Sequence, residues 1–101
     1  MVIILNLLSE HHRMYGYEIS QRVKEQSGDK ILIKDGSLYP ALQKMTKDGL
    51  LTFEEEYIGK RVRKYYSLTK KGKAQTVTSI AEVKDFMDTL NQLLFAKTSL
   101  A

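Results

Sequence analysis

The chain has 101 residues, a formal net charge of +4 and no cysteine. This length suits a single domain with a modest core, and the lack of cysteine excludes disulfides and thiolate metal sites. The basic excess favours an anionic partner, because seven lysines and arginines lie within residues 60–73. The apolar run at residues 2–8 is too short for a membrane span, which needs about 20 residues. We therefore expect a cytoplasmic protein without membrane contact.

The first third of the chain predicts two helices and a short strand. Residues 2–8 are apolar almost all round, which indicates a helix buried on several sides. Residues 11–14 are polar and mark a turn, and residues 16–26 form a second helix that Gly28 ends. The apolar piece at residues 31–33 is expected to be a small strand that closes a sheet.

A third helix begins near Asp35 or Ser37, because both residues are good N-caps, and it ends at Gly49. If Ser37 is the cap, Pro40 falls in the first turn, where its missing N–H is harmless. A period of 3.6 residues places an apolar face on Leu38, Ala41, Leu42 and Met45. The other face carries Tyr39, Pro40, Gln43, Lys44 and Lys47.

Two strands follow. Residues 52–57 and 62–68 are rich in aromatic and β-branched side chains, and Gly59 lies in the turn between them. The alternation is imperfect, because Glu55 shares its side of the strand with Phe53 and Tyr57. We therefore expect a short, largely exposed ribbon.

From about Lys70 to about Phe95 the pattern predicts one long helix. A heptad seam runs along it at Ile80, Val83, Met87, Leu90 and Leu94. Phe86 and Leu93 form a second stripe beside the seam. Two adjacent apolar stripes are more than this small domain can cover, so we expect the helix to pair with a second copy of the chain.

A helix followed by a basic hairpin is typical of a winged helix-turn-helix that binds DNA. The predicted fold class is therefore α+β and mostly helical. Residues 1–69 are predicted to form the winged helix-turn-helix DNA-binding domain, and residues 70–101 the C-terminal dimerisation helix. The two parts are expected to form one compact unit rather than independent domains.

Four segments carry a family resemblance. They are Tyr15-Gly16-Tyr17-Glu18-Ile19, Gly36-Ser37-Leu38-Tyr39-Pro40-Ala41-Leu42, Asp48-Gly49-Leu50 and Arg63-Lys64-Tyr65-Tyr66-Ser67-Leu68-Thr69. In this order they resemble the PadR family of bacterial transcriptional regulators and cover most of the chain. The resemblance implies a homodimer, held through the first and last helices, that regulates transcription from double-stranded DNA. It also implies that the first helix is clipped, because PadR-like chains usually have several more residues there.

The polar face of the third helix holds candidate DNA contacts, with Gln43 as a side chain that can both donate to and accept from a base. The set is Ser37, Tyr39, Gln43, Lys44 and Lys47. The alternative is a plain solvated helix face, which this segment alone favours. The neighbouring basic hairpin and the family resemblance shift the balance toward DNA contact.

The hairpin adds Lys60, Arg61 and Lys64 as candidate contacts with the phosphate backbone or the minor groove. Charges that protect an edge strand from aggregation are the alternative, but they explain only one or two of the four cations at positions 60–64. Strand alternation puts Arg61 and Arg63 on one face of the hairpin and Lys60 and Lys64 on the other, so the two sets cannot face DNA equally. We expect Lys60 and Arg61 to contact DNA at the tip, and Arg63 to hold the hairpin against the body.

The remaining polar and aromatic clusters favour structure over chemistry. Tyr65, Tyr66 and Leu68 are expected in the core, with Tyr15 and Tyr17 packed around the turn between helices. Residues 54–56 are three glutamates, which alternation separates and which repulsion from DNA would push to the outward side. A solvated run is therefore expected rather than a metal site.

The adjacent His11 and His12 point about 100° apart on a helix and cannot chelate one ion. Neither histidine has a recognisable companion for a nucleophilic triad. No catalytic residue, metal site or cofactor is predicted.

The predicted function is a sequence-specific transcriptional regulator, a homodimeric repressor on an inverted-repeat operator. A winged-helix module that binds protein and not DNA is the alternative, although it would need an apolar outer face on the third helix. By the resemblance, a small hydrophobic effector is a candidate partner between the C-terminal helices. The chain has no tryptophan, so an effector cannot stack on an indole there. The side chains in that region are Val83, Phe86, Met87 and Leu90.

Overall fold

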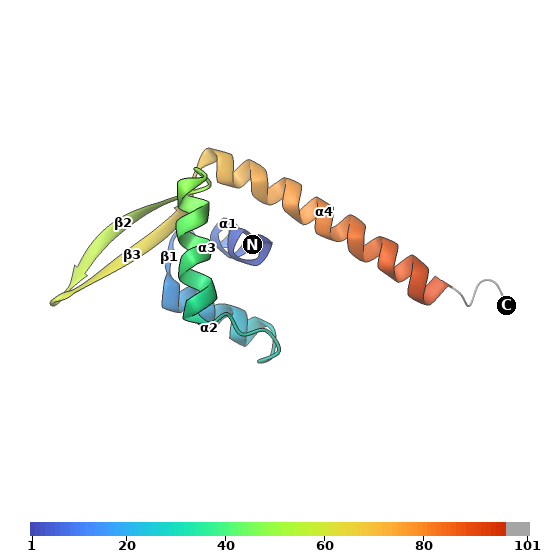
Figure 1. Cartoon of the computed structure of the whole chain (residues 1–101), viewed down its shortest axis with the longest axis horizontal. Coiled ribbons are helices and arrows are strands. Elements are labelled where there is room, and N and C mark those ends of the chain that lie inside the picture. Colours follow the sequence, from blue (N-terminus) through green and yellow to red (C-terminus); the bar gives the residue numbers. More distant parts are fainter. Residues whose placement is uncertain (97–101) are drawn as a thin grey trace.

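The computed structural model describes residues 1–96 as four helices and three strands (Figure 1). In chain order these are α1 (Val2–Glu10), β1 (Met14–Tyr15), α2 (Gly16–Gln26), α3 (Asp35–Lys47), β2 (Leu51–Ile58), β3 (Arg61–Leu68) and α4 (Lys70–Phe95). The arrangement confirms the α+β, mostly helical class with a hairpin wing and a long last helix. The end of the predicted segment 70–101, residues 97–101, lies outside the described residues.

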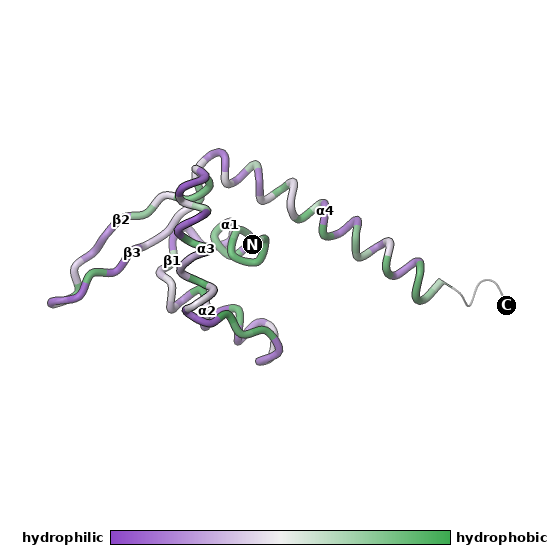
Figure 2. Tube along the Cα trace, in the orientation of Figure 1, coloured by the Kyte–Doolittle hydropathy of each residue, from purple (hydrophilic) through white to green (hydrophobic). Residues whose placement is uncertain are grey.

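The core lies where α1, α2 and α3 meet the base of the sheet. Its largest fully buried side chains are Ile4, Leu7, Met14, Ile19, Leu38 and Leu42. α1 is apolar along most of its length (Figure 2), and burial of four of its residues confirms the predicted central position. The predicted apolar face of α3 is confirmed as well, because Met45 is also buried and Ala41 packs against the cluster.

The three strands form one antiparallel sheet in the order β1-β3-β2. β2 and β3 pair from Leu51↔Leu68 to Ile58↔Arg61. The turn between them contains Gly59, whose φ of 64° suits a residue without a side chain. Each strand has eight residues, so the ribbon is longer than predicted. It is largely exposed, as predicted, and extends from the body as a wing (Figure 1).

The third strand of the sheet is β1, and the prediction of a strand at residues 31–33 is wrong. Met14 and Tyr15 pair with β3, whereas residues 31–34 belong to no strand in the described chain. The Ser27 hydroxyl accepts a hydrogen bond from the Ile31 N–H at 2.9 Å and donates to its carbonyl at 3.3 Å. This local closure satisfies backbone groups that a strand would have paired. Ile33 alone of this apolar piece packs against the core.

α3 starts one turn earlier than a Ser37 cap would allow. Lys34 is the N-cap and Asp35 the first helical residue. The Lys34 carbonyl accepts hydrogen bonds from the N–H groups of Ser37 and Leu38 at 2.9 and 2.8 Å. Ser37 therefore lies inside the helix, and the expectation that it caps α3 is wrong. Pro40 falls in the second turn, where its missing N–H removes one helical hydrogen bond.

The start of α4 is joined to the turn between α3 and β2. The Thr69 hydroxyl accepts a hydrogen bond from the Gly72 N–H at 3.0 Å and donates to the Gly49 carbonyl at 2.6 Å. The Thr69 N–H donates to the Leu50 carbonyl at 3.0 Å. At Gly72 an added Cβ would overlap the Leu50 carbonyl oxygen. These contacts fix the direction in which α4 leaves the body.

The first half of α4 lies beside α1 and buries Thr76, and the half that follows projects away from the other elements (Figure 1). Residues 81–96 are all exposed, and hydrophobic and hydrophilic positions alternate along the helix (Figure 2). The structure confirms the predicted single helix from Lys70 to Phe95. Apolar side chains such as Phe86, Met87 and Leu94 are more than half exposed in the single chain.

Gly72→Ala should lower the free energy of unfolding by about 1–3 kcal/mol, because the new methyl group has to displace the Leu50 carbonyl. Gly36→Ala is the matched control. Nothing lies within 4 Å of a Cβ at that position, and alanine is better than glycine in a helix by up to about 1 kcal/mol. Urea unfolding followed by circular dichroism measures both changes. A Gly72→Ala protein as stable as the Gly36→Ala protein would contradict the tight contact.

Candidate nucleic-acid interface

The outer face of α3 carries a polar stripe. Tyr39, Gln43 and Lys47 are exposed, and their spacing of four residues aligns them along the helix. Ser37 is exposed near the helix start. Ser37 lies two turns from Lys44 and so on the same flank of α3 rather than on the stripe. Three of the five predicted contact residues of α3 thus share its outer side.

The Tyr39 ring lies against Gly16 at the start of α2. A Cβ at Gly16 would lie 2.8 Å from the Tyr39 hydroxyl, so a larger residue there would push the ring aside. Tyr39 nevertheless remains 42% exposed. A positioned phenol of this kind is a suitable donor to a phosphate oxygen.

Lys44 lies apart from the stripe, on a flank of α3. It borders a hollow with Met1 of the N-terminus and Gln75 of α4. Its ammonium forms an ion pair with Asp48 at 3.2 Å, one turn along the helix. The structure therefore does not group Lys44 with Tyr39 and Gln43.

An open groove of about 470 Å³ separates α3 from the wing. Its polar lining is Tyr15, Tyr39, Gln43, Glu55, Arg63, Lys64 and Tyr66. Lys64 lies with its ammonium 4.7 Å from the centre of the Phe53 ring. The groove brings three predicted contact residues, Tyr39, Gln43 and Lys64, into one surface although two separate elements supply them.

Lys60 and Arg61 occupy the tip of the wing. Lys60 lies in the turn and Arg61 begins β3, and both are exposed. The tip extends well beyond α3 (Figure 1), so these two cations do not share the groove with Tyr39. The predicted set thus divides into a groove group and a tip group.

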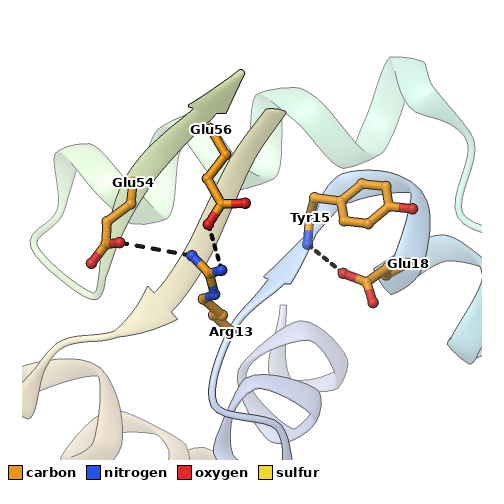
Figure 3. A network of polar contacts seen from close by, with 5 residues as sticks. All are labelled: Arg13, Tyr15, Glu18, Glu54 and Glu56. Atoms are coloured by element: carbon orange, nitrogen blue, oxygen red, sulfur yellow. Dashed lines mark hydrogen bonds and ion pairs between the residues drawn. The ribbon is translucent and has the colours of Figure 1, made fainter. Parts of the chain in front are cut away.

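The back face of the wing is the one that carries Glu54, Glu56 and Tyr65. Arg13 joins this face to the body (Figure 3). Its guanidinium donates a hydrogen bond to Glu56 at 2.5 Å and lies 3.7 Å from a Glu54 oxygen. It also stands over the Tyr65 ring, 4.3 Å from its centre. Glu54 remains exposed and Glu56 partly exposed on this outward face, as a solvated run predicts. Glu55 lines the groove instead, so the expectation that all three glutamates face outward is wrong for Glu55.

Arg63 has the structural position that the sequence predicts. Its guanidinium lies 4.3 Å from the centre of the Tyr15 ring, and the Tyr15 and Tyr65 rings meet edge to face at 5.4 Å. Tyr66 is buried, while Tyr15 and Tyr65 are half-buried. The predicted core position is confirmed for Tyr66 but is wrong for Tyr65, which lies outside the core cluster. Tyr15 packs near the turn as expected.

Tyr17 does not pack as predicted, because it is 61% exposed. α2 docks through Gly16, Ile19 and Val23, which lie three and four residues apart on one side of the helix. Tyr17 is turned about 100° from Gly16 and so faces solvent. Figure 3 shows the neighbouring Tyr15 N–H, which donates to the Glu18 carboxylate at 3.1 Å and fixes the start of α2.

Three side chains near the wing base have shifted pKa values. A hydrogen bond with Glu56 raises the pKa of Arg13, and a hydrogen bond with Tyr65 raises the pKa of Arg63. Burial raises the pKa of Tyr66. Each shift moves the pKa further from neutrality, so none of these three groups changes charge near pH 7.

The two histidines lie at the turn after α1, where His11 is the C-cap. Within residues 1–96, no group of three or more His, Cys, Asp or Glu side chains could hold a metal ion. No helix in this part of the chain is long and apolar enough to cross a membrane.

The contacts of Arg13 and the direction in which Glu55 faces were not predicted from the sequence. A period of two places Glu54 and Glu56 on one face of a strand and Glu55 on the other. That signal was available, but it does not say which face looks toward α3. Arg13 precedes Glu56 by 43 residues, and no local pattern connects the two.

Comparison with known proteins agrees with this architecture. The model of the transcriptional regulator PadR-like family matches residues 4–77. The negative transcriptional regulator PadR of Bacillus subtilis (strain 168) is 36% identical over 73 residues, which are 71% of this chain and 40% of that protein. The chain thus spans less than half of that relative.

Solved structures show the same fold. A transcriptional regulator from Clostridium thermocellum superposes with a TM-score of 0.85 at 28% identity, covering 92% of this chain and 90% of that one. Bacillus subtilis PadR in complex with operator DNA superposes with a TM-score of 0.71 at 32% identity, covering 78% of this chain and 45% of that one. Because the family model spans the whole winged helix and the first part of α4, the chain belongs to the PadR-like family of transcriptional regulators.

Proposed function

We propose that this transcriptional regulator binds operator DNA sequence-specifically as a homodimer and represses transcription from an inverted repeat. The observation that carries the proposal is the open groove between the polar stripe of α3 and the cationic wing. A solved relative, Bacillus subtilis PadR, is in complex with operator DNA. The polar and cationic outer face of α3 suits a nucleic acid better than an apolar protein surface.

In the proposed complex α3 enters the major groove, which admits a helix, and the wing tip reaches the adjacent minor groove. One sugar–phosphate backbone separates these two grooves of a duplex, so it passes between α3 and the wing. Gln43 then reads a base edge, because its amide both donates and accepts. Phosphates are held by Tyr39, Lys47 and Lys64 along the groove, by Ser37 and Lys44 on the flank of α3, and by Lys60 and Arg61 where the wing tip borders the minor groove.

The proposed dimer rests on the projecting half of α4. A helical segment of about 15 residues without tertiary contacts is marginal in water, and residues 81–96 are all exposed. Pairing the seam with that of a second copy would cover Ile80, Val83, Met87, Leu90 and Leu94. An apolar hollow in which Ile3 of α1 adjoins Ile80 and Val83 extends this surface onto the first helix.

The proposal divides the chain by role. Residues 1–69 bind DNA, and residues 70–101 join the two copies. A small hydrophobic effector would contact Val83, Phe86, Met87 and Leu90 between the paired helices. By changing the spacing of these helices it would change the separation of the two α3 helices.

Leu90→Asp should convert the dimer to a monomer, because it buries a charge in each half of the seam. Gln92→Asp is the matched control, since it adds the same charge on the side of α4 away from the seam. Light scattering at micromolar concentration measures the mass of each variant. A wild-type mass of one chain would refute the dimer, and so would a Leu90→Asp protein as dimeric as the control.

The wing should supply affinity and α3 should supply specificity. Lys60→Ala and Arg61→Ala should weaken binding to all duplexes alike and reduce the salt slope by up to about 0.9 per lost phosphate contact. Gln43→Ala should narrow the difference between operator and random DNA by about 1–3 kcal/mol. Fluorescence anisotropy over a range of salt concentrations measures both quantities. The roles are reversed if the wing variants alter sequence preference and Gln43→Ala does not.

The operator should be an inverted repeat with half-sites about 10 bp apart or a multiple of that, because a two-fold dimer presents both α3 helices to one side of the duplex. Selection of bound sequences from random duplex DNA identifies it. Inserting about 5 bp between the half-sites should then reduce binding to the non-specific level. Equal affinity for a half-site and for the full repeat at the same salt would show that the dimer does not bind the two half-sites as a symmetric unit.

A further inference from the structure

Glu55 faces the groove between α3 and the wing, whereas the glutamates on either side of it face away. It lies opposite Lys64 in the strand register, and both side chains line the groove. Glu54 and Glu56 point to the back of the wing, where Arg13 holds them (Figure 3). Glu55 is therefore the one carboxylate in the lining of this groove.

The Glu55 carboxylate is exposed, and within residues 1–96 it forms no ion pair or side-chain hydrogen bond. Lys64 is its cross-strand partner, but the Lys64 ammonium lies over the Phe53 ring. The Glu55 carboxylate therefore makes no polar contact in the described part of the chain that would stabilise the fold. Its charge faces the surface where a partner would bind.

We propose that Glu55 limits the sequence-independent affinity of this protein for duplex DNA. The inference rests on the proposed function, in which one phosphate backbone passes through the groove. A carboxylate in that path repels the phosphates and attracts Lys64, which otherwise binds one of them. Neither effect depends on base sequence, so Glu55 weakens binding to random and operator DNA alike and leaves selectivity to α3.

Glu55→Gln tests this with Glu54→Gln as the matched control. Both variants raise the net charge by one on the same strand, and the Glu54 side chain is 81% exposed on the opposite face. The probe is a fluorescein-labelled random-sequence duplex of about 30 bp, titrated with the full chain at salt from about 50 to about 200 mM. Circular dichroism melting establishes that both variants fold as the wild type does.

Glu55→Gln should bind about fivefold more tightly than wild type at the lowest salt, the size of one unit of charge repulsion at about 4 Å in water. This advantage should shrink as salt rises, because screening weakens the repulsion that the wild type suffers. Glu54→Gln should stay within about twofold of wild type, because its charge lies on the far face of the wing.

Two results overturn the inference while the proposed function stands. If Glu55→Gln and Glu54→Gln bind equally well, only net charge matters and the position of Glu55 does not. If Glu55→Gln binds more weakly than wild type, the carboxylate makes a favourable contact with DNA. If neither the wild type nor Glu55→Gln binds the duplex at any salt tested, the proposed function fails and this inference fails with it.

Discussion

The backbone of α4 passes the Leu50 carbonyl so closely at Gly72 that no side chain fits between them, and Thr69 ties the same turn to the helix start. The direction of α4 relative to α3 depends on this joint. A helix of 26 residues is about 39 Å long, so a small rotation at its start displaces its far end by several ångströms. In the proposed dimer, the separation of the two α3 helices follows from the joint and from the register of the seam.

Leu51 and Tyr66 join the base of the wing to the core, and contacts between cations and aromatic rings add to this attachment. Arg13 in the turn before β1 stands over Tyr65 of β3, and Arg63 of β3 stands over Tyr15 of β1. Guanidinium groups stay charged near neutral pH, so these contacts persist across that range. Arg13 also keeps two of three consecutive glutamates on the back of the wing. The attachment that orients the wing thus sets which charges face the groove.

The sequence by itself determined most elements, because their patterns depend on neighbours within about four residues. The buried Leu38 and Leu42 of α3, the turn at Gly59 and the long helix that Thr69 caps all followed from such spacing. The same spacing grouped Tyr39, Gln43 and Lys47 on one exposed face, although contact with DNA remains a proposal. Where two local signals competed, as with Asp35 and Ser37 at the start of α3, spacing alone did not choose between them.

Only the tertiary structure decided which segments meet. β1 took the place in the sheet that was predicted for residues 31–33, because Met14 and Tyr15 pair with a strand about fifty residues away. Arg13 donates a hydrogen bond to Glu56, which follows it by 43 residues in the sequence. Alternation separated Glu55 from its neighbours, but the packing of Tyr66 into the core decided which side of the wing faces α3. Such choices depend on how whole elements dock, and the spacing within one segment carries no information about its partner.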